Sequence, residues 1–180
     1  MTIRAAAVAV AAAAVLAGCS SSSPAPRPSA TESQAAAVAW SPCDGLTAAS
    51  VGRIAGARLA MHTGTVDQPR CTFVPRTRGG PAYDVSYLWF DGGLDEALDS
   101  MGAISSQLRS VPVPGADAAR LAVREKKSGV LVTGFVQTKG LVQSVNAVDL
   151  TPYDRRAFVT SVTDLLAQLA RTAPRAPAQQ

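Results

Sequence analysis

The spacing of apolar residues along the chain predicts three helices. The first spans about 47–55, where Thr47 can cap the start and Gly56 can end it. The third begins at Thr151-Pro152, a cap and a first-turn proline, and is followed by apolar residues at helical spacing. The second is expected over 93–109, where apolar side chains recur on one face: Leu94, Leu98, Met101 and Leu108.

Between these helices, apolar and polar residues alternate as they do in β-strands. Short strands are expected at 71–75 and, as an edge segment, near 57–64, and a longer strand at 83–90. Glycine turns then separate three further strands: 120–126, 130–137 and 141–148. This order predicts an α+β fold, a single small domain with a mostly antiparallel sheet packed with about three helices.

The first forty residues follow a different pattern. An unbroken apolar run covers 5–16 behind Arg4, too short to span a membrane as a helix but typical of a secretory signal. Serine, proline and alanine dominate 19–38, which predicts a disordered linker. The folded domain is expected over 39–171, and a disordered tail over 172–180.

The residues that end the apolar run, Leu16-Ala17-Gly18-Cys19, resemble the lipobox of bacterial lipoproteins. That resemblance implies a diacylglyceryl thioether on Cys19, palmitate-type acyl chains, and cleavage between Gly18 and Cys19. Residues 1–18 would then be a lipoprotein signal peptide. The protein would be held by its lipid at the extracytoplasmic face of the cell membrane, without spanning it. The alternative is a plain signal peptide with an incidental cysteine.

Cysteine count and charge narrow the picture further. With Cys19 lipidated in an oxidising compartment, Cys43 and Cys71 are expected to form one disulfide. A metal site is disfavoured, because the chain has no CxxC motif and one histidine, His62. The formal net charge of +4 is compatible with anionic lipids or wall polymers, whereas a secreted chain without an aromatic-basic motif is not expected to bind nucleic acid.

Two segments carry a family resemblance. SPCDGLTAASVGRIAG at 41–56 and CTF at 71–73, behind a lipobox and a serine/proline linker, resemble uncharacterised actinobacterial, mycobacterial-type lipoproteins of unknown function. In many of these a Pro-Cys precedes the first helix, and a later Cys-x-aromatic is its disulfide partner. The resemblance implies the disulfide and the location. It implies no catalytic residue, and similar domains serve as sensors or envelope accessory factors.

The residues give no sign of an enzyme. The chain lacks GxSxG, SxxK and glycine-rich phosphate-loop motifs, and no thiol is left free, so no cofactor and no catalytic residue are expected. Asp91, Asp95 and Asp99 recur every four residues, as in a cation site or a solvated helix face. The solvated face is favoured, because hard cations need many oxygens from different directions.

Two groups of side chains are candidate contact sites. Tyr83, Tyr87 and Trp89 share one strand face and could line a pocket for a lipid or sugar, or could form ordinary core. A basic group could contact anionic headgroups or wall polymer, or could be solvated: Arg70, Arg76 and Arg78.

These patterns favour a non-enzymatic binding module for a lipid or other small amphipathic ligand. The alternative is an accessory or structural envelope lipoprotein that docks on a protein partner. The first function predicts an internal apolar cavity near Tyr87, Trp89 and the helix at 93–109. The second predicts a packed interior with an exposed patch.

Overall fold

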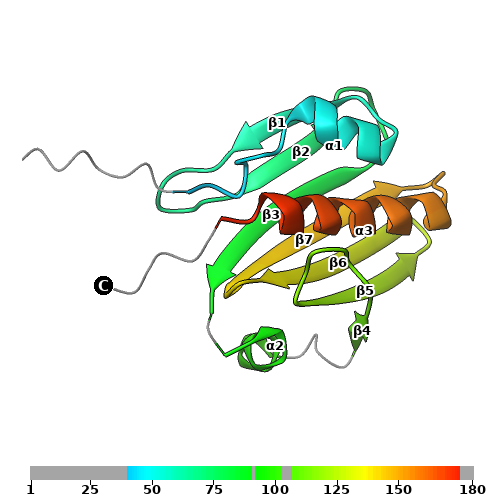
Figure 1. Cartoon of the computed structure of the whole chain (residues 1–180). Helices are drawn as coiled ribbons and strands as arrows, with labels where there is room; N and C mark the ends of the chain where they lie inside the picture. Colours follow the sequence, from blue (N-terminus) through cyan, green and yellow to red (C-terminus); the bar gives the residue numbers. More distant parts are fainter. Residues whose placement is uncertain (1–39, 91, 103–106, 175–180) are drawn as a thin grey trace, which may run out of the picture. The chain divides into compact units, whose positions relative to one another are not determined.

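The computed structural model describes residues 40–90, 92–102 and 107–174, which belong to one compact unit, Ala36–Gln180. Gly18, Cys19, Asp91 and the last six residues of the predicted tail lie outside the described residues. The elements are α1 (Ala48–Ala55), β1 (Leu59–Thr63), β2 (Cys71–Pro75), β3 (Ala82–Trp89), α2 (Leu94–Met101), β4 (Arg109–Ser110), β5 (Ala118–Lys126), β6 (Gly129–Thr138), β7 (Leu141–Leu150) and α3 (Arg155–Thr172). The predicted α+β class is confirmed (Figure 1).

The strands form one seven-stranded antiparallel sheet in the order β1-β2-β3-β7-β6-β5-β4. The predicted three-strand run is confirmed as β5, β6 and β7, and the turn between the last two contains Lys139 at φ 51°. β3 joins the two halves of the sheet by pairing with β7 along its whole length, from Ala82 opposite Val148 to Trp89 opposite Leu141.

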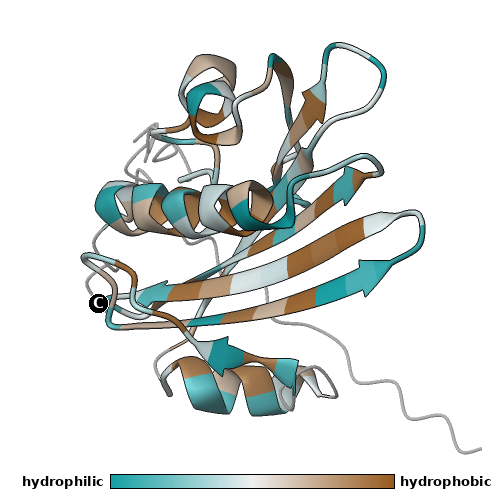
Figure 2. Ribbon diagram, turned by 90° about the vertical axis from the view of Figure 1, so that its right-hand side faces the viewer, coloured by the Kyte–Doolittle hydropathy of each residue, from teal (hydrophilic) through white to brown (hydrophobic). Residues whose placement is uncertain are grey.

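Helices cover the two faces of the sheet unequally. α3 packs on β6 and β7 and against α1, and α2 packs on the other face of β6 (Figure 2). Strand alternation separates the faces, because Gly134 lies beneath α3 while its neighbour Phe135 joins the cluster around α2. A Cβ at Gly134 would lie 2.9 Å from Leu166, so glycine allows α3 to approach the sheet closely.

The predicted helix at 93–109 is wrong in its length. α2 ends at Met101, because Gly102 adopts φ 84° and its N–H bonds to the carbonyl of Asp99. Leu108 is buried beside Leu94 and Leu98 in the same cluster, but it lies beyond the helix. Met101 is 47% exposed and does not share their inward face.

The predicted start of the last helix is also wrong. α3 is capped by Asp154, whose carboxylate accepts a hydrogen bond from the N–H of Ala157 at 3.0 Å, so Thr151-Pro152 lies before the helix. The predicted apolar face is confirmed, since all of its residues are buried: Phe158, Val162, Leu165, Leu166 and Leu169. Neither α3 nor any other helix in the described segments combines the length and the apolar character that crossing a membrane requires.

Cys43 and Cys71 lie at a spacing compatible with a disulfide bond. Their sulfur atoms are adjacent and their Cα atoms are 5.1 Å apart. Cys43 precedes α1 and Cys71 opens β2, so the pair joins the chain ahead of the first helix to the sheet.

Candidate functional site

The three aromatic residues predicted on one face of β3 have different surroundings. Tyr83 is 1% exposed, and its ring centroid lies 6.0 Å from that of Phe158 on α3, so it is a core residue. Tyr87 is partly exposed and packs edge-on against Trp40, with ring centroids 4.7 Å apart. Trp89, at the end of the strand, is partly exposed as well. The three side chains therefore do not line one pocket.

A buried polar pair fixes Tyr83. The Ser161 hydroxyl donates to the carbonyl of Phe158 at 2.7 Å, so the Tyr83 hydroxyl donates to Ser161 Oγ at 2.9 Å. Burial raises the pKa of Tyr83 to about 12, against the effect of the bond to Ser161. Tyr83 stays protonated at neutral pH and holds β3 against α3.

Near the aromatic residues the hollows are small. One of about 160 Å³ lies between Leu88, Met101 and Phe135, and one of about 140 Å³ lies beside Trp40 and Tyr87. Pockets that enclose small ligands have about 300–1,000 Å³. Neither of these two hollows, as the described residues line it, therefore has the room to enclose the ligand predicted for Tyr87 and Trp89.

The three predicted arginines do not form one surface. Arg70 precedes β2 and lies 3.8 Å from Asp84, whereas Arg76 and Arg78 follow the strand. Five strand residues at about 3.3 Å each separate the two ends. Arg76 instead lies beside Arg58, because the pairing of β1 with β2 continues one step further and the N–H of Arg76 donates to the carbonyl of Arg58 at 2.9 Å.

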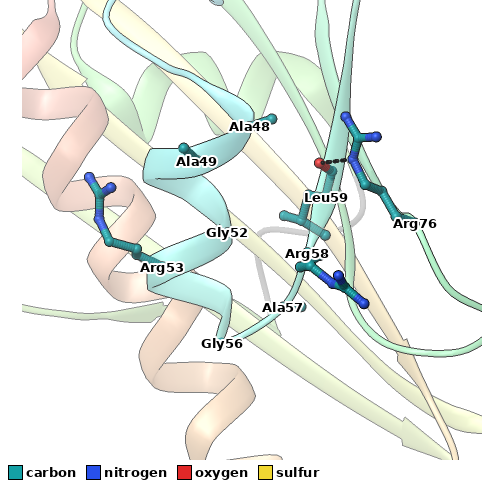
Figure 3. A pocket seen from close by; sticks show the side chains of 9 residues that line it. All are labelled: Ala48, Ala49, Gly52, Arg53, Gly56, Ala57, Arg58, Leu59 and Arg76. Carbon is teal, nitrogen blue, oxygen red and sulfur yellow. Dashed lines mark hydrogen bonds between the residues drawn. The ribbon is translucent and has the colours of Figure 1, made fainter.

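The reversal after α1 builds a groove at this place. Thr47 caps the helix through a bond from the N–H of Ser50 at 3.0 Å, and Gly56 ends it at φ 62°, as predicted. The N–H of Ala57 then bonds to the carbonyl of Gly52 at 3.0 Å, which turns the chain back along the helix into β1. The groove of about 450 Å³ that results is lined by Ala48, Ala49, Gly52, Arg53, Gly56, Ala57, Arg58, Leu59 and Arg76 (Figure 3).

Gly52 lets the helix and the returning chain approach closely. A Cβ at this position would lie 2.7 Å from the carbonyl oxygen of Ala57, a backbone atom that cannot turn aside. The wall of the groove on the helix side is therefore small and apolar. Apart from Arg53, it consists of alanine and glycine, which leave the backbone accessible to a ligand.

The groove is rich in unpaired positive charge. The Nε of Arg76 donates to the carbonyl of Leu59 at 3.1 Å, which fixes the guanidinium at the rim and leaves its two Nη groups without a partner among the described residues (Figure 3). Within the described ranges, Arg53 and Arg58 form no side-chain hydrogen bond or ion pair, and both are exposed. None of the described residues that line the groove carries a carboxylate. Arg53 extends from the side of α1 away from β1, whereas Arg58 and Arg76 are joined through their backbones on the strand side of the groove (Figure 3).

Local sequence patterns did not predict that Arg53, Arg58 and Arg76 line one groove. Arg53 and Arg58 are single arginines in a helix and a turn, without a motif around them. The signal that could have found the pair is the register of the β1–β2 hairpin, which places Arg58 opposite Arg76. Like charges directly opposite on paired strands are destabilising, so an anion bound between such residues would offset that cost.

A second hollow, of about 350 Å³, lies between α1 and α3. Arg53, Asp149, Asp154 and Ser161 are among its lining residues. The Oδ1 of Asp149 is buried without a hydrogen-bond partner in the described part of the chain. Burial raises the pKa of Asp149, and the backbone of Leu150 opposes this rise.

The raised pKa of Asp149 predicts a pH-dependent stability. The folded state binds this proton more tightly than the unfolded state, so the resulting stabilisation is complete below the unfolded pKa and is lost as pH rises through the folded pKa. Asp149→Asn keeps an uncharged group at every pH. It should raise the melting temperature near neutral pH, and the difference should shrink in acid.

Differential scanning calorimetry over a pH series checks this expectation. Asp164→Asn, the same change at an exposed position of α3, is the matched control and should shift the melting temperature little at any pH. If Asp149→Asn instead lowers the melting temperature equally at all pH values, the folded structure requires the carboxylate at this position.

The other predicted polar candidates are spread over the surface. His62 is exposed on the edge strand β1. Asp95 accepts two hydrogen bonds from Arg120, at 2.7 and 2.9 Å, and Asp91 lies outside the described residues. Among the residues that the structure describes, no three histidine, cysteine, aspartate or glutamate side chains gather to hold a metal ion.

Side chains from three segments thus meet at one groove: the helix α1, the turn after it and the residue that follows β2. Arginine presents fixed donors that match carboxylate and phosphate groups. No protein-family model, no curated protein and no solved structure matches the chain.

Proposed function

We propose that this protein is a lipid-anchored, non-enzymatic binding lipoprotein of the extracytoplasmic membrane face, and that the α1–β1 groove takes the anionic group of a small amphipathic ligand. The observation that carries the proposal is the pair Arg58 and Arg76. The two are backbone neighbours one step beyond the pairing of β1 with β2. Among the described residues, the Nη groups of Arg76 have no partner and no carboxylate lines the groove. A phosphate or carboxylate would relieve their mutual repulsion and accept charge-assisted hydrogen bonds.

The rest of the groove supports an amphipathic rather than a purely ionic ligand. Its remaining lining, apart from Arg53, consists of alanine, glycine and Leu59, which offer apolar contact and no further charge. Its volume of about 450 Å³ falls in the range of small-ligand pockets, enough for a head group with a short apolar part.

The chemistry of the lining residues favours binding over catalysis. Arginine stays protonated in proteins, so it cannot act as a general base, and alanine, glycine and leucine carry no reactive group. The proposed location at the membrane is inferred from the lipobox residues. The disulfide expected between Cys43 and Cys71 supports it, because disulfides form in oxidising compartments outside the cytoplasm. The resemblance to actinobacterial lipoproteins is consistent with that location.

A titration of the lipid-free protein tests the groove. A chain that begins at Ser20 contains the whole compact unit Ala36–Gln180 and lacks the lipid acceptor. Calorimetry would follow its binding of a short-chain phosphatidylglycerol below the concentration at which that lipid forms micelles. We expect binding, and at least about tenfold weaker binding by Arg58→Gln/Arg76→Gln, since a hydrogen bond to a charged group contributes about 1.5–3 kcal/mol.

Two controls make the result specific. Arg124→Gln/Lys126→Gln removes the same charge from exposed positions of β5 and should bind like the parent. The short-chain phosphatidylcholine of equal length should bind more weakly, because its zwitterionic head group carries no net charge. If the two double variants bind phosphatidylglycerol with equal affinity, the groove is not the binding site. No binding by any of these chains would favour docking on an envelope protein, to be sought by crosslinking.

A further inference from the structure

One end of the domain carries partly exposed aromatic and apolar side chains. Trp40, the first described residue, packs edge-on against Tyr87 at 4.7 Å. The loop that joins β1 to β2 lies beside the start of the described chain (Figure 1). It contributes Val66 and Pro69 to the shallow hollow that Trp40 and Tyr87 also line. We call Trp40, Val66, Pro69 and Tyr87 the linker-end surface, because the predicted linker 19–38 joins the domain at this place.

The exposure of this surface is unusual for its composition. Val66 is 88% exposed, the highest value among the large apolar side chains of the described segments. Both tryptophans of the chain lie at this end, since Trp89 is two residues beyond Tyr87 on the same face of β3. Tryptophan and tyrosine have an apolar ring with a polar tip, which suits the boundary between water and lipid.

We propose that the linker-end surface rests on the lipid bilayer, with Trp40 and Val66 entering the head-group region. The hollow of about 140 Å³ between these residues is too small to enclose a ligand, so the chemistry points to a surface contact. This inference goes beyond the proposed groove ligand, and it rests on the lipid anchor of the proposed function.

The position of the linker supports a membrane as the occupant. Cys19 and Trp40 are 21 residues apart in the sequence, and a random-coil linker of that length has ends about 25 Å apart on average. An anchor at Cys19 would therefore keep this end of the domain close to the bilayer, so that the effective concentration of lipid near the linker-end surface is high. An affinity for lipid that is modest, yet measurable for the free protein, is then sufficient to orient the anchored domain.

The contact should depend little on charge. Arg70 is the charged residue that lines the hollow, and Asp84 lies 3.8 Å from its Nε. Apolar burial is unaffected by screening, so vesicle binding through this surface should persist in high salt. The arginine groove begins at Arg58, ahead of β1, whereas Val66 follows that strand, so the length of β1 separates the two sites.

Vesicle binding by the chain that begins at Ser20 tests the proposal. The probes are vesicles of phosphatidylcholine alone, and binding is followed by the blue shift of tryptophan fluorescence and by cosedimentation. We expect partition at both low salt and about 1 M salt, where the Debye length is about 3 Å. Trp40→Ala and Val66→Asp should each lower the partition coefficient by about tenfold, as expected for the loss of roughly 60 Å² of apolar contact.

Matched variants separate this surface from the groove. Leu150→Asp places the same charge on another exposed apolar residue, 53% exposed at the far end of β7, and should leave partition unchanged. Val66→Asp cannot disturb the core, so its effect does not depend on how well Trp40→Ala folds. Absence of partition, or partition unaffected by both variants, would overturn the proposal. Binding that needs anionic lipid and is lost in high salt or in Arg58→Gln/Arg76→Gln would also overturn it, while supporting the groove.

Discussion

Cys43→Ser should lower the free energy of unfolding by about 3–4 kcal/mol. A bond between Cys43 and Cys71 closes a loop of 28 residues, and the lost entropy of the unfolded chain gives this figure on the loop-closure relation. The melting temperature should fall by roughly 10 °C for a domain of this size. Cys43 is the better position for the change, since Cys71 is fully buried and a serine there would add a buried hydroxyl.

Thermal unfolding with and without a reductant checks this result. The parent should melt well above Cys43→Ser in oxidising buffer, and the two should converge once the parent is reduced. Thiol titration of the unfolded parent before reduction should find no free thiol on either cysteine of the pair. Equal melting temperatures in oxidising buffer would mean that the pair, although correctly spaced, contributes no covalent constraint.

Cys19→Ala should abolish lipidation of the protein in its native host or a close relative. The thiol of Cys19 is the group that the lipobox resemblance identifies as the acyl acceptor, and alanine cannot form a thioether. Intact-mass analysis should find the parent as residues 19–180 with added acyl chains, and the variant without them and with the signal peptide uncut. The effect is expected to be complete rather than partial, because no second cysteine precedes Cys43.

The mass readout separates the anchor from the other membrane contact proposed for this chain. A measurement of partition into membranes would not separate the two contacts. The apolar leader of an uncut precursor and the linker-end surface can both hold the protein at the membrane. Cys43→Ser is the matched control and should be lipidated and cleaved like the parent. A Cys19→Ala protein with acyl mass, or one cleaved before residue 19, would refute the lipobox.

Local patterns determined much of the secondary structure. The helix at 48–55 follows from a capping threonine and a terminating glycine, and the hairpins at 118–150 follow from alternation broken by glycine turns. These signals act over neighbouring residues, so a single sequence contains them. The prediction failed where two local signals competed. The apolar spacing predicted that the second helix continues to residue 109, but Gly102 ends it, and the third helix is capped by Asp154 rather than beginning at Thr151-Pro152.

The candidate site depends on contacts that no local pattern specifies. Alternation placed Tyr83, Tyr87 and Trp89 on one face, but their contacts differ. Tyr83 packs against Phe158 and Ser161 of α3 and is core, whereas Tyr87 packs against Trp40 and is partly exposed. The groove needs the β1–β2 register to set Arg58 beside Arg76. The amino-acid sequence by itself was enough to predict a cellular location, the cysteine pair, and the approximate positions of the three helices and of every described strand except β4. Only the tertiary structure decided which charges meet without a partner and which aromatic rings stay exposed, because both depend on packing between segments far apart in the chain.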